Sequence, residues 1–307
     1  MIETVHAAGA TVRTALIPAA GWGTRSLPAS KAVPKEMLPI VDKPLIQYAV
    51  EEAFAAGVER VVLVLSPGKQ SLVNHFQRQD TLVRELEAKG KTEALTRLAA
   101  SDLPDGCLLV VTQQEPLGLG HAISCARHVI DGEPFAVLLP DDLVLADTPV
   151  LKQMIQAYSY NGQGGHMIAV QNVQPNDVDK YGIIDPGGPV DDRATVAIRG
   201  MVEKPSPMDA PSTLAVIGRY ILDSSIFQAL EHQAPGAGGE IQLTDAIARG
   251  IGSMPVNGFR FEGTRFDCGN PSGFIRANIA FGLQREDIAP AIRGMLAPIP
   301  RWQDAAD

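Results

Sequence analysis

The first half of the chain alternates short, continuously apolar runs with amphipathic stretches. Continuous apolar strands separated by helices are what a parallel sheet covered on both faces requires. Right-handed crossovers would wind such a half into a Rossmann-like sheet. The expected strands are residues 14–18, 61–66, 107–112 and 135–140, and the helical patterns between them cover residues 44–56, 71–100 and 118–129.

The second half mixes strand-like runs with turns rich in proline and glycine, and has fewer helical patterns. It is expected to form a subregion that continues the same sheet. The predicted fold class is therefore α/β, with a Rossmann-like, mixed and mainly parallel sheet flanked by helices. The first dozen residues and the tail after Ile288 look irregular, because prolines in the tail argue against a long helix. The expected strands here are residues 166–173, 195–202, 214–222 and 256–262, and the expected helices lie near residues 224–232, 243–251 and 271–284.

The composition is that of an ordinary globular protein, with 45% hydrophobic and 20% charged residues among 307. Its net charge of −9 lacks the basic footprint of a protein that binds DNA or RNA. No apolar run approaches the roughly 20 residues that span a bilayer, and the N-terminus does not resemble a secretion signal. The three cysteines lack C-x-x-C spacing and are expected to be free thiols, which favours a reducing, cytoplasmic location.

The first predicted strand runs into a loop of small residues, AAGWG, at positions 19–23. Such a loop offers backbone N–H groups to a phosphate, and Arg25 and Lys35 would add charge-assisted hydrogen bonds. It matches neither G-x-G-x-x-G, because Ser26 replaces the third glycine, nor the Walker pattern. By itself it could be a flexible surface loop with two cations. The loop residues expected to bind a nucleotide are Ala20, Gly21 and Gly23.

Polar residues follow two further predicted strands at the point where each ends. Gln113 comes soon after Val111, and the pair Asp141 and Asp142 follows Leu139. In an open parallel sheet, ligands bind beyond the carboxyl ends of the strands. The positions of these polar residues therefore predict a nucleotide site at that edge.

The longer pattern G-x-G-T-R, then P-x-x-K, then P-K-E-M-L-P resembles the signature of the bacterial sugar-1-phosphate nucleotidyltransferases. The wording KAVPKEMLPIVDKPLIQY is similar in particular to the branch that uses UTP and glucose 1-phosphate. The resemblance extends from about Thr14 to Gln284. It implies a homo-oligomer, dimer or tetramer. It also implies a nucleotidyltransferase domain over residues 14–285, with a nucleotide-binding half (14–145) and a sugar-binding half (146–285), between an N-terminal extension (1–13) and a tail (286–307).

Two strand-end aspartates are candidates for a metal site. A hard cation such as Mg²⁺ takes one or two carboxylates together with phosphate oxygens and waters. The resemblance implies that Asp141 and Asp267 share Mg²⁺ and that Asp141 also faces the nucleotide, with Asp142 a less certain neighbour. Alternatively, Asp141 and Asp142 open a turn, and Asp267 begins the cap of a helix at residues 270–271.

Gln113 and the turn of residues 118–121, with Gly118 at its start, form the expected base pocket. A glutamine amide offers one acceptor and one donor, which match the N3–H and a carbonyl of uracil but not the edge of cytosine. Thymine differs from uracil by a methyl group, which is worth only about 1–3 kcal/mol in discrimination. His121 is expected to be an exposed residue in the first turn of a helix, without a catalytic role.

Glu203 and Lys204 close a predicted strand. Alternation would place neighbouring side chains on opposite faces, but a turn at the strand end can bring both into one cleft. The resemblance implies that Glu203 accepts sugar hydroxyls, that Lys204 holds the sugar phosphate and that Gly182 lies against the sugar. As a bare tripeptide, E-K-P would be a solvated turn. Residues 239–245, GEIQLTD, resemble a family motif that shapes the sugar pocket, and none of them is assigned a role.

No pair of serine or cysteine with histidine indicates covalent catalysis, and the charge of Asp267 should raise the pKa of Cys268. The resemblance therefore implies Mg²⁺-assisted, direct in-line displacement of pyrophosphate from UTP by glucose 1-phosphate, giving UDP-glucose. The expected catalytic residues are Arg25, Lys35 and Lys204. Two alternatives stay open: a glucose-1-phosphate thymidylyltransferase, and a non-catalytic regulatory relative that binds a true enzyme.

Overall fold

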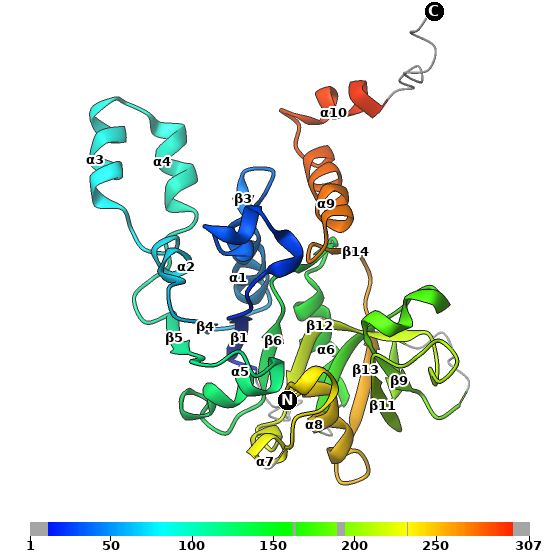
Figure 1. Ribbon diagram of the computed structural model, residues 1–307. Coiled ribbons are helices and arrows are strands. Elements are labelled where there is room, and N and C mark those ends of the chain that lie inside the picture. The colour runs from blue at the N-terminus through cyan, green and yellow to red at the C-terminus, as the bar shows by residue number, and fades with distance from the viewer. Residues whose placement is uncertain (1–11, 162–163, 189–193, 232, 297–307) are drawn as a thin grey trace, which may run out of the picture.

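The computed structural model describes residues 12–161, 164–188, 194–231 and 233–296. In this part of the chain, a ten-stranded sheet forms the centre of the molecule (Figure 1). Its strands are β1 (Thr14–Ala19), β4 (Arg60–Leu65), β5 (Leu108–Thr112), β6 (Phe135–Leu138), β8 (His166–Asn172), β9 (Gly182–Asp185), β10 (Thr195–Ala197), β11 (Gly200–Glu203), β12 (Leu214–Leu222) and β13 (Val256–Arg260).

The strand order is β10-β13-β8-β12-β6-β1-β4-β5, and β9, itself paired with β11, joins the sheet at β12. β6, β1, β4 and β5 are all parallel, whereas β12 is antiparallel to both of its main neighbours. Seven of the ten strands run in one direction, and β10, β11 and β12 run in the other. The predicted fold class, a mixed and mostly parallel sheet flanked by helices, is confirmed.

Each face of the sheet carries its own hydrophobic core. Ala15 and Ile17 of β1 belong to one core and Leu16 to the other, as the two-residue period of a strand requires. The first core packs against α1 (Leu45–Ala55) and α6 (Val150–Asn161), and the second against α5 (Leu119–Cys125), α7 (Ile226–Glu231) and α8 (Leu243–Gly250). Both faces are thus covered, so the chain is apolar throughout the central strands.

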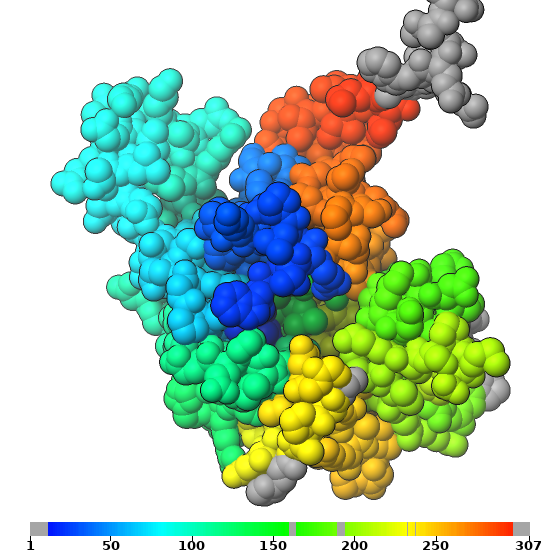
Figure 2. Space-filling model, in the orientation of Figure 1, coloured from blue at the N-terminus to red at the C-terminus, as the bar shows by residue number. Residues whose placement is uncertain are grey.

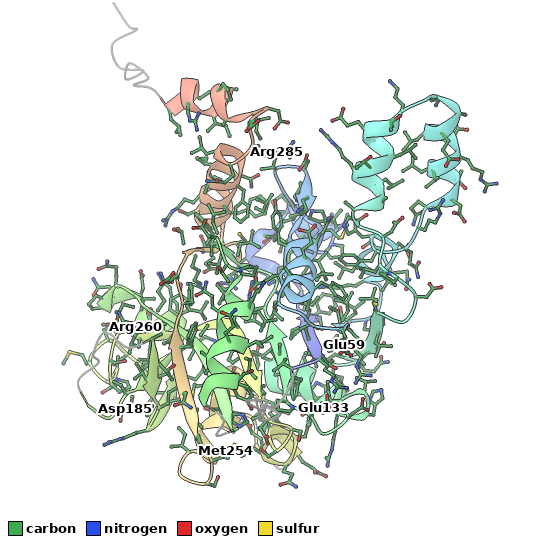
Figure 3. The ribbon with its side chains drawn as sticks, turned by 180° about the vertical axis from the view of Figure 1, so that it is seen from behind. Glu59, Glu133, Asp185, Met254, Arg260 and Arg285 are labelled. Atoms are coloured by element: carbon green, nitrogen blue, oxygen red, sulfur yellow. The ribbon has the colours of Figure 1, made fainter. Side chains whose placement is uncertain are left out.

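A third, smaller core joins the end of the chain to its beginning. It lies between helix α9 (Pro271–Leu283) and an antiparallel pair of strands, β7 (Asp142–Leu145) and β14 (Thr264–Asp267). Asn270 caps α9, because its side chain accepts the N–H of Gly273 at 2.9 Å. At the corner before α10 (Ala289–Leu296), Arg285 binds Asp42 at 2.9 Å (Figure 3).

The remaining elements are short. No helix in the described residues is long and apolar enough to cross a membrane. β2 (Pro39–Ile40) pairs with β3 (Lys43–Pro44). Short segments of 3-10 helix are η1 (Thr24–Ser26), η2 (Ala29–Lys31), η3 (Lys35–Met37), η4 (Arg127–Val129), η5 (Pro175–Lys180) and η6 (Ala237–Gly239).

Several expected elements differ in the structure. The amphipathic stretch 71–100 divides into α2 (Gln70–Asn74), α3 (Asp80–Ala88) and α4 (Thr92–Ala99), with Gly90 at a φ of +63° between the last two. The run 195–202 is two strands, because β10 pairs with β13 and β11 with β9. α6 was not predicted, and the tail forms the short α10, whose first turn accommodates Pro290. Residue 232, at the end of the expected helix 224–232, lies outside the described residues.

Candidate active site

A cavity of about 830 Å³ opens beyond the carboxyl ends of the parallel strands. Figure 2 looks onto this face, which is hollowed between the dark-blue N-terminal loop and the yellow and yellow-green segments of the second half. The cavity brings together six residues predicted from the sequence. These are Arg25, Asp141, Gly182, Glu203, Lys204 and Asp267.

The glycine loop leaves β1 at Ala19 and turns sharply at Gly23, where φ is +66°. A Cβ atom at Gly23 would lie 3.1 Å from the Cβ of Lys35, so this position has both a conformational and a steric need for glycine. A Cβ at Gly21 would have no atom within 4 Å. The main chain at Gly21 is therefore open to close approach by a ligand, as expected of a phosphate loop.

Lys69 holds this loop from behind, although the sequence analysis did not single it out. Its Nζ donates to the carbonyl oxygens of Ala19 at 2.5 Å and Gly21 at 2.8 Å. The same ammonium binds the carboxylate of Glu36, which is 1% exposed, at 3.0 Å. Burial lowers the pKa of Lys69 and raises that of Glu36, while each is opposed by the charge of the other. Lys69 follows the carboxyl end of β4, so the strand-end rule would have found it.

Lys35 and Asp141 form an ion pair, with Nζ and Oδ2 2.6 Å apart. Burial alone would raise the pKa of Asp141, but the charges of Lys35 and Arg25 hold it below its usual value. The carboxylate is therefore ionised near neutral pH. It is available as an anionic ligand at the end of the sheet.

Gly269 shows how closely the charged groups converge. A Cβ atom there would lie 2.8 Å from Nη2 of Arg25, 2.9 Å from Oδ1 of Asp267 and 3.1 Å from Oδ2 of Asp141. The N–H of Cys268 donates to the carbonyl oxygen of Asp141 at 2.7 Å, which fixes the two segments together. Two carboxylates and one guanidinium thus surround a single point. This donor set fits a hard divalent cation that completes its shell with phosphate oxygens and water.

No group of three or more potential metal-ligating side chains occurs in the described residues. Asp267 begins the segment that leads to the cap of α9: its Oδ1 accepts the N–H of Gly269 at 2.9 Å, and Asn270 supplies the cap itself.

Asp142 differs from its neighbour Asp141 in every contact. Contrary to expectation, the two do not end one strand: β6 stops at Leu138, and Asp142 begins β7. Arg265 binds Oδ1 of Asp142 at 2.5 Å, and the N–H of Gly218 donates to Oδ2 at 2.9 Å. Both oxygens of Asp142 are thus engaged within the protein. The contacts assign it to the scaffold of the site.

A buried ion pair supports the chain just before Asp141. Arg219, 1% exposed, binds Glu52 of α1 at 2.7 Å and donates to the carbonyl oxygen of Leu139 at 3.0 Å. Burial would lower the pKa of Arg219, but Glu52 raises it and keeps the guanidinium charged. Neither residue carried a sequence signal, since the two are 167 positions apart.

At the expected base end of the site, Gln113 is buried, and its Nε2 donates to the carbonyl oxygen of Gly118 at 3.2 Å and contacts Nδ1 of His121 at 2.9 Å. His121 is half-buried rather than exposed as expected. A Cβ at Gly118 would lie 2.8 Å from the Cβ of Glu240, so glycine is needed there for packing. Ile241 donates to Leu117 at 2.7 Å, which ties the GEIQLTD segment to the base end.

At the end of the cavity expected to bind the sugar, Glu203 is the last residue of β11 and lies opposite Gly182. Thr244 donates to Oε2 of Glu203 at 2.7 Å, and a Cβ at Gly182 would lie 3.1 Å from the same oxygen. Lys204 has a φ of +46°, which is uncommon for a residue other than glycine, and its Nζ lies 3.4 Å from Oε1 of Glu203. This break in alternation brings both side chains into the cavity. The prediction that a turn would do so is confirmed.

The other predicted residues lie beside the cavity. Lys35 does not line the cavity but binds Asp141, which does. Gln113 binds Gly118, which precedes the cavity-lining Leu119. Ala20, Gly21 and Gly23 form the loop that leads to Arg25. All three cysteines are free thiols: Cys268 is buried, and Cys107 and Cys125 are half-buried. Burial first, and then the nearby carboxylates, raise the pKa of Cys268 to about 12, so the expected direction is confirmed.

Comparison with known proteins places this geometry in context. The family model described as Nucleotidyl transferase matches residues 14–282. A UTP–glucose-1-phosphate uridylyltransferase of Bacillus subtilis is 47% identical over 290 residues, covering 93% of this chain and 97% of its own length. One from Komagataeibacter xylinus is 49% identical over 259 residues, covering 84% and 90%. The solved structure of a UTP-bound enzyme from Acinetobacter baumannii, named UGPase, has a TM-score of 0.86 and 39% identity, covering 94% of this chain and all of that one.

Proposed function

Because the chain belongs to the nucleotidyl transferase family, we propose that it is an enzyme that joins UTP and glucose 1-phosphate into UDP-glucose, releasing pyrophosphate. The observation that carries this proposal is that one cavity holds two separate sets of charged groups. One end holds Arg25 with two carboxylates, and the other holds an acid and a base, Glu203 and Lys204. Such an arrangement suits two anionic substrates that must meet. Relatives with the named activity align with 93% and 84% of this chain.

In the proposed reaction, an oxygen of the sugar phosphate attacks the α-phosphorus of UTP in line, and pyrophosphate leaves on the opposite side. Alignment and charge neutralisation are the main catalytic tasks, because both reactants are anions. Lys204 binds the attacking phosphate, while Glu203 is held by Thr244 to accept a sugar hydroxyl. At the other end, Arg25 and Lys35 neutralise the triphosphate, and the open main chain at Gly21 admits it.

Asp141 and Asp267 would hold Mg²⁺, which, when bound, supplies positive charge to the phosphate oxygens. The convergence of the two carboxylates on Gly269 supports this assignment. Gln113 would read the base and Gly182 would lie against the sugar. These assignments divide the domain into a nucleotide-binding half, residues 14–145, and a sugar-binding half, residues 146–285.

We also propose a homo-oligomer, dimer or tetramer, in the cytoplasm. Exposed apolar side chains on the two C-terminal helices, Ile275, Met295 and Leu296, support an association between copies.

The proposed activity is tested by measuring pyrophosphate release with UTP, dTTP, CTP and ATP, each with glucose 1-phosphate and galactose 1-phosphate. We expect the highest kcat/KM for UTP with glucose 1-phosphate. A preference for dTTP would instead identify a thymidylyltransferase. Absence of turnover with every pair would favour a non-catalytic relative.

Removal of divalent cations is expected to abolish pyrophosphate release, because two carboxylates beside a triphosphate repel it unless a cation intervenes. Dialysis against EDTA followed by addition of Mg²⁺ or Mn²⁺ should restore the rate. In Asp267→Asn, half-maximal activity should require a higher Mg²⁺ concentration, as measured by titration. Full activity in metal-free buffer would contradict the assignment of the two aspartates.

At the sugar end, Glu203→Gln and Lys204→Ala are each expected to lower kcat/KM for glucose 1-phosphate by roughly 10- to 100-fold, since each removes a charged contact. Calorimetric affinity for UTP should stay within about twofold, because neither side chain faces the triphosphate. The two variants should differ in selectivity. Lys204→Ala should weaken every sugar phosphate alike, because Lys204 contacts the phosphate that they share, whereas Glu203→Gln should affect sugars according to their hydroxyls.

Lys180→Ala is the matched control, because Lys180 also lines the cavity but binds Asp177 at 2.5 Å. Its kinetics should resemble those of the unmodified protein. Unchanged sugar kinetics in both Glu203→Gln and Lys204→Ala would return this segment to the solvated turn that its bare sequence suggests.

A further inference from the structure

The side-chain amide of Gln113 has a defined orientation. Its nitrogen end lies 3.2 Å from the carbonyl oxygen of Gly118. A carbonyl oxygen can only accept a hydrogen bond, so the end of the amide that faces it must be the NH₂ group. Rotating the amide by half a turn would place two oxygens against each other.

His121 adds a second constraint to the same end of the amide. Its Nδ1 lies 2.9 Å from Nε2 of Gln113. Because Nε2 of Gln113 can only donate, Nδ1 must accept, which leaves the other ring nitrogen of His121 as the possible donor. That nitrogen lies 3.8 Å from Sγ of Cys125, one helical turn further along α5. The ring is thus placed to contribute an acceptor toward Gln113.

These two contacts leave the oxygen of the amide for a ligand. Within the described residues, both hydrogen bonds of the Gln113 side chain are made by Nε2, and none is made by Oε1. We propose that His121 is a positioning residue that fixes the Gln113 amide with its oxygen toward the base, and that it thereby sets the preference for uracil over cytosine. This inference rests on the proposed function, in which Gln113 reads the base of the nucleotide.

The chemistry of the bases explains why the orientation matters. N3 of uracil carries a hydrogen, which Oε1 accepts, whereas N3 of cytosine carries a lone pair, which Oε1 repels. A rotated amide would donate to cytosine instead, but its oxygen would then face two acceptors, the Gly118 carbonyl and the imidazole. Thymine has the same N3–H as uracil. His121 therefore controls the choice between UTP and CTP but not the choice between UTP and dTTP.

The test uses two substitutions of the same shape. His121→Leu removes the acceptor. His121→Asn introduces a side chain of the same shape as leucine but returns an amide oxygen close to the position of Nδ1. Pyrophosphate release with UTP, CTP and dTTP gives the ratios of kcat/KM. We expect His121→Leu to lower the UTP to CTP ratio by roughly tenfold, the effect of one hydrogen bond, and to leave the UTP to dTTP ratio within about twofold. His121→Asn should retain both ratios.

Cys125→Ala is the control for a purely structural effect, because it alters the other contact of the ring and leaves Nδ1 in place. Both ratios should be unchanged in it. The inference is overturned if His121→Leu keeps the original UTP to CTP ratio, or if His121→Asn loses it as His121→Leu does.

A measurement on the unmodified protein keeps the inference testable if His121→Leu does not fold. In 3-deaza-CTP, a C–H group replaces N3 and its lone pair, so a fixed Oε1 should accept this analogue at least tenfold better than CTP. Equal turnover of the two cytosine nucleotides would overturn the inference. Absence of turnover with UTP itself would instead refute the proposed function, which separates the two failures.

Discussion

Asp141→Asn is expected to lower kcat for pyrophosphate release by about 10²–10³-fold, while the protein remains folded. Loss of one preorganised electrostatic group at a reacting centre has effects of this size. The free energy of unfolding should fall only modestly, because Lys35, which loses its ion-pair partner, keeps 18% of its side chain exposed to water. Steady-state kinetics and thermal unfolding of the same preparation give both values.

Asp142→Asn provides the matched comparison, since it is the same substitution one residue away. It leaves Arg265 buried without its carboxylate partner and should lower the free energy of unfolding by about 3–5 kcal/mol. Chemical denaturation measures that change. The activity of the variant is measured at a temperature at which it remains folded. If Asp141→Asn were the less stable variant and Asp142→Asn the less active one, the assigned roles would be reversed.

Lys69→Met is expected to lower both stability and activity, because it removes the clamp on the glycine loop and leaves the carboxylate of Glu36 buried and unpaired. The free energy of unfolding should fall by about 3–5 kcal/mol. Activity should fall because the carbonyl oxygens of Ala19 and Gly21 lose their common donor. The N–H groups of the loop would then no longer be held in one arrangement toward the triphosphate.

The double variant Lys69→Met with Glu36→Gln separates the two effects. Removing the buried charge should recover much of the lost stability, as in other replacements of whole buried ion pairs. Turnover of UTP should stay low, because the loop still lacks its clamp. A double variant that recovered stability and activity together would mean that Lys69 serves only to neutralise Glu36.

The sequence predicted best those elements whose signal is local. The run 214–222 is apolar apart from Gly218 and Arg219, and β12 occupies those nine residues, all of them buried. β7 and β14 escaped prediction because each is four residues long and carries charge, and each becomes a strand only by pairing with the other across about 120 positions. The stretch 71–100 kept a helical pattern through Gly90, so the pattern could not show where the helix breaks.

The site follows the same division. Asp141, Asp267 and the pair Glu203 and Lys204 were identified by their places at strand ends and by family motifs. The residues that position them were missed because they join distant parts of the chain. Lys69 with Glu36, and Arg265 with Asp142, look like ordinary surface charges until folding buries them. Only the tertiary structure shows which charges have a partner.

One consequence of the strand order concerns how specificity can change. The glycine loop follows β1. Gly182 of β9 and Glu203 of β11 lie at the sugar end, and these two strands connect to β1 through β12 and β6 in a continuous hydrogen-bonded ladder. Neighbouring strands in such a ladder are about 4.8 Å apart, so the sheet fixes the distance between the two subsites. Loops can lengthen or shorten without altering that spacing. A different sugar could thus be accommodated by exchanging side chains on β9, β11 and α8, while the phosphate-transfer geometry is inherited unchanged.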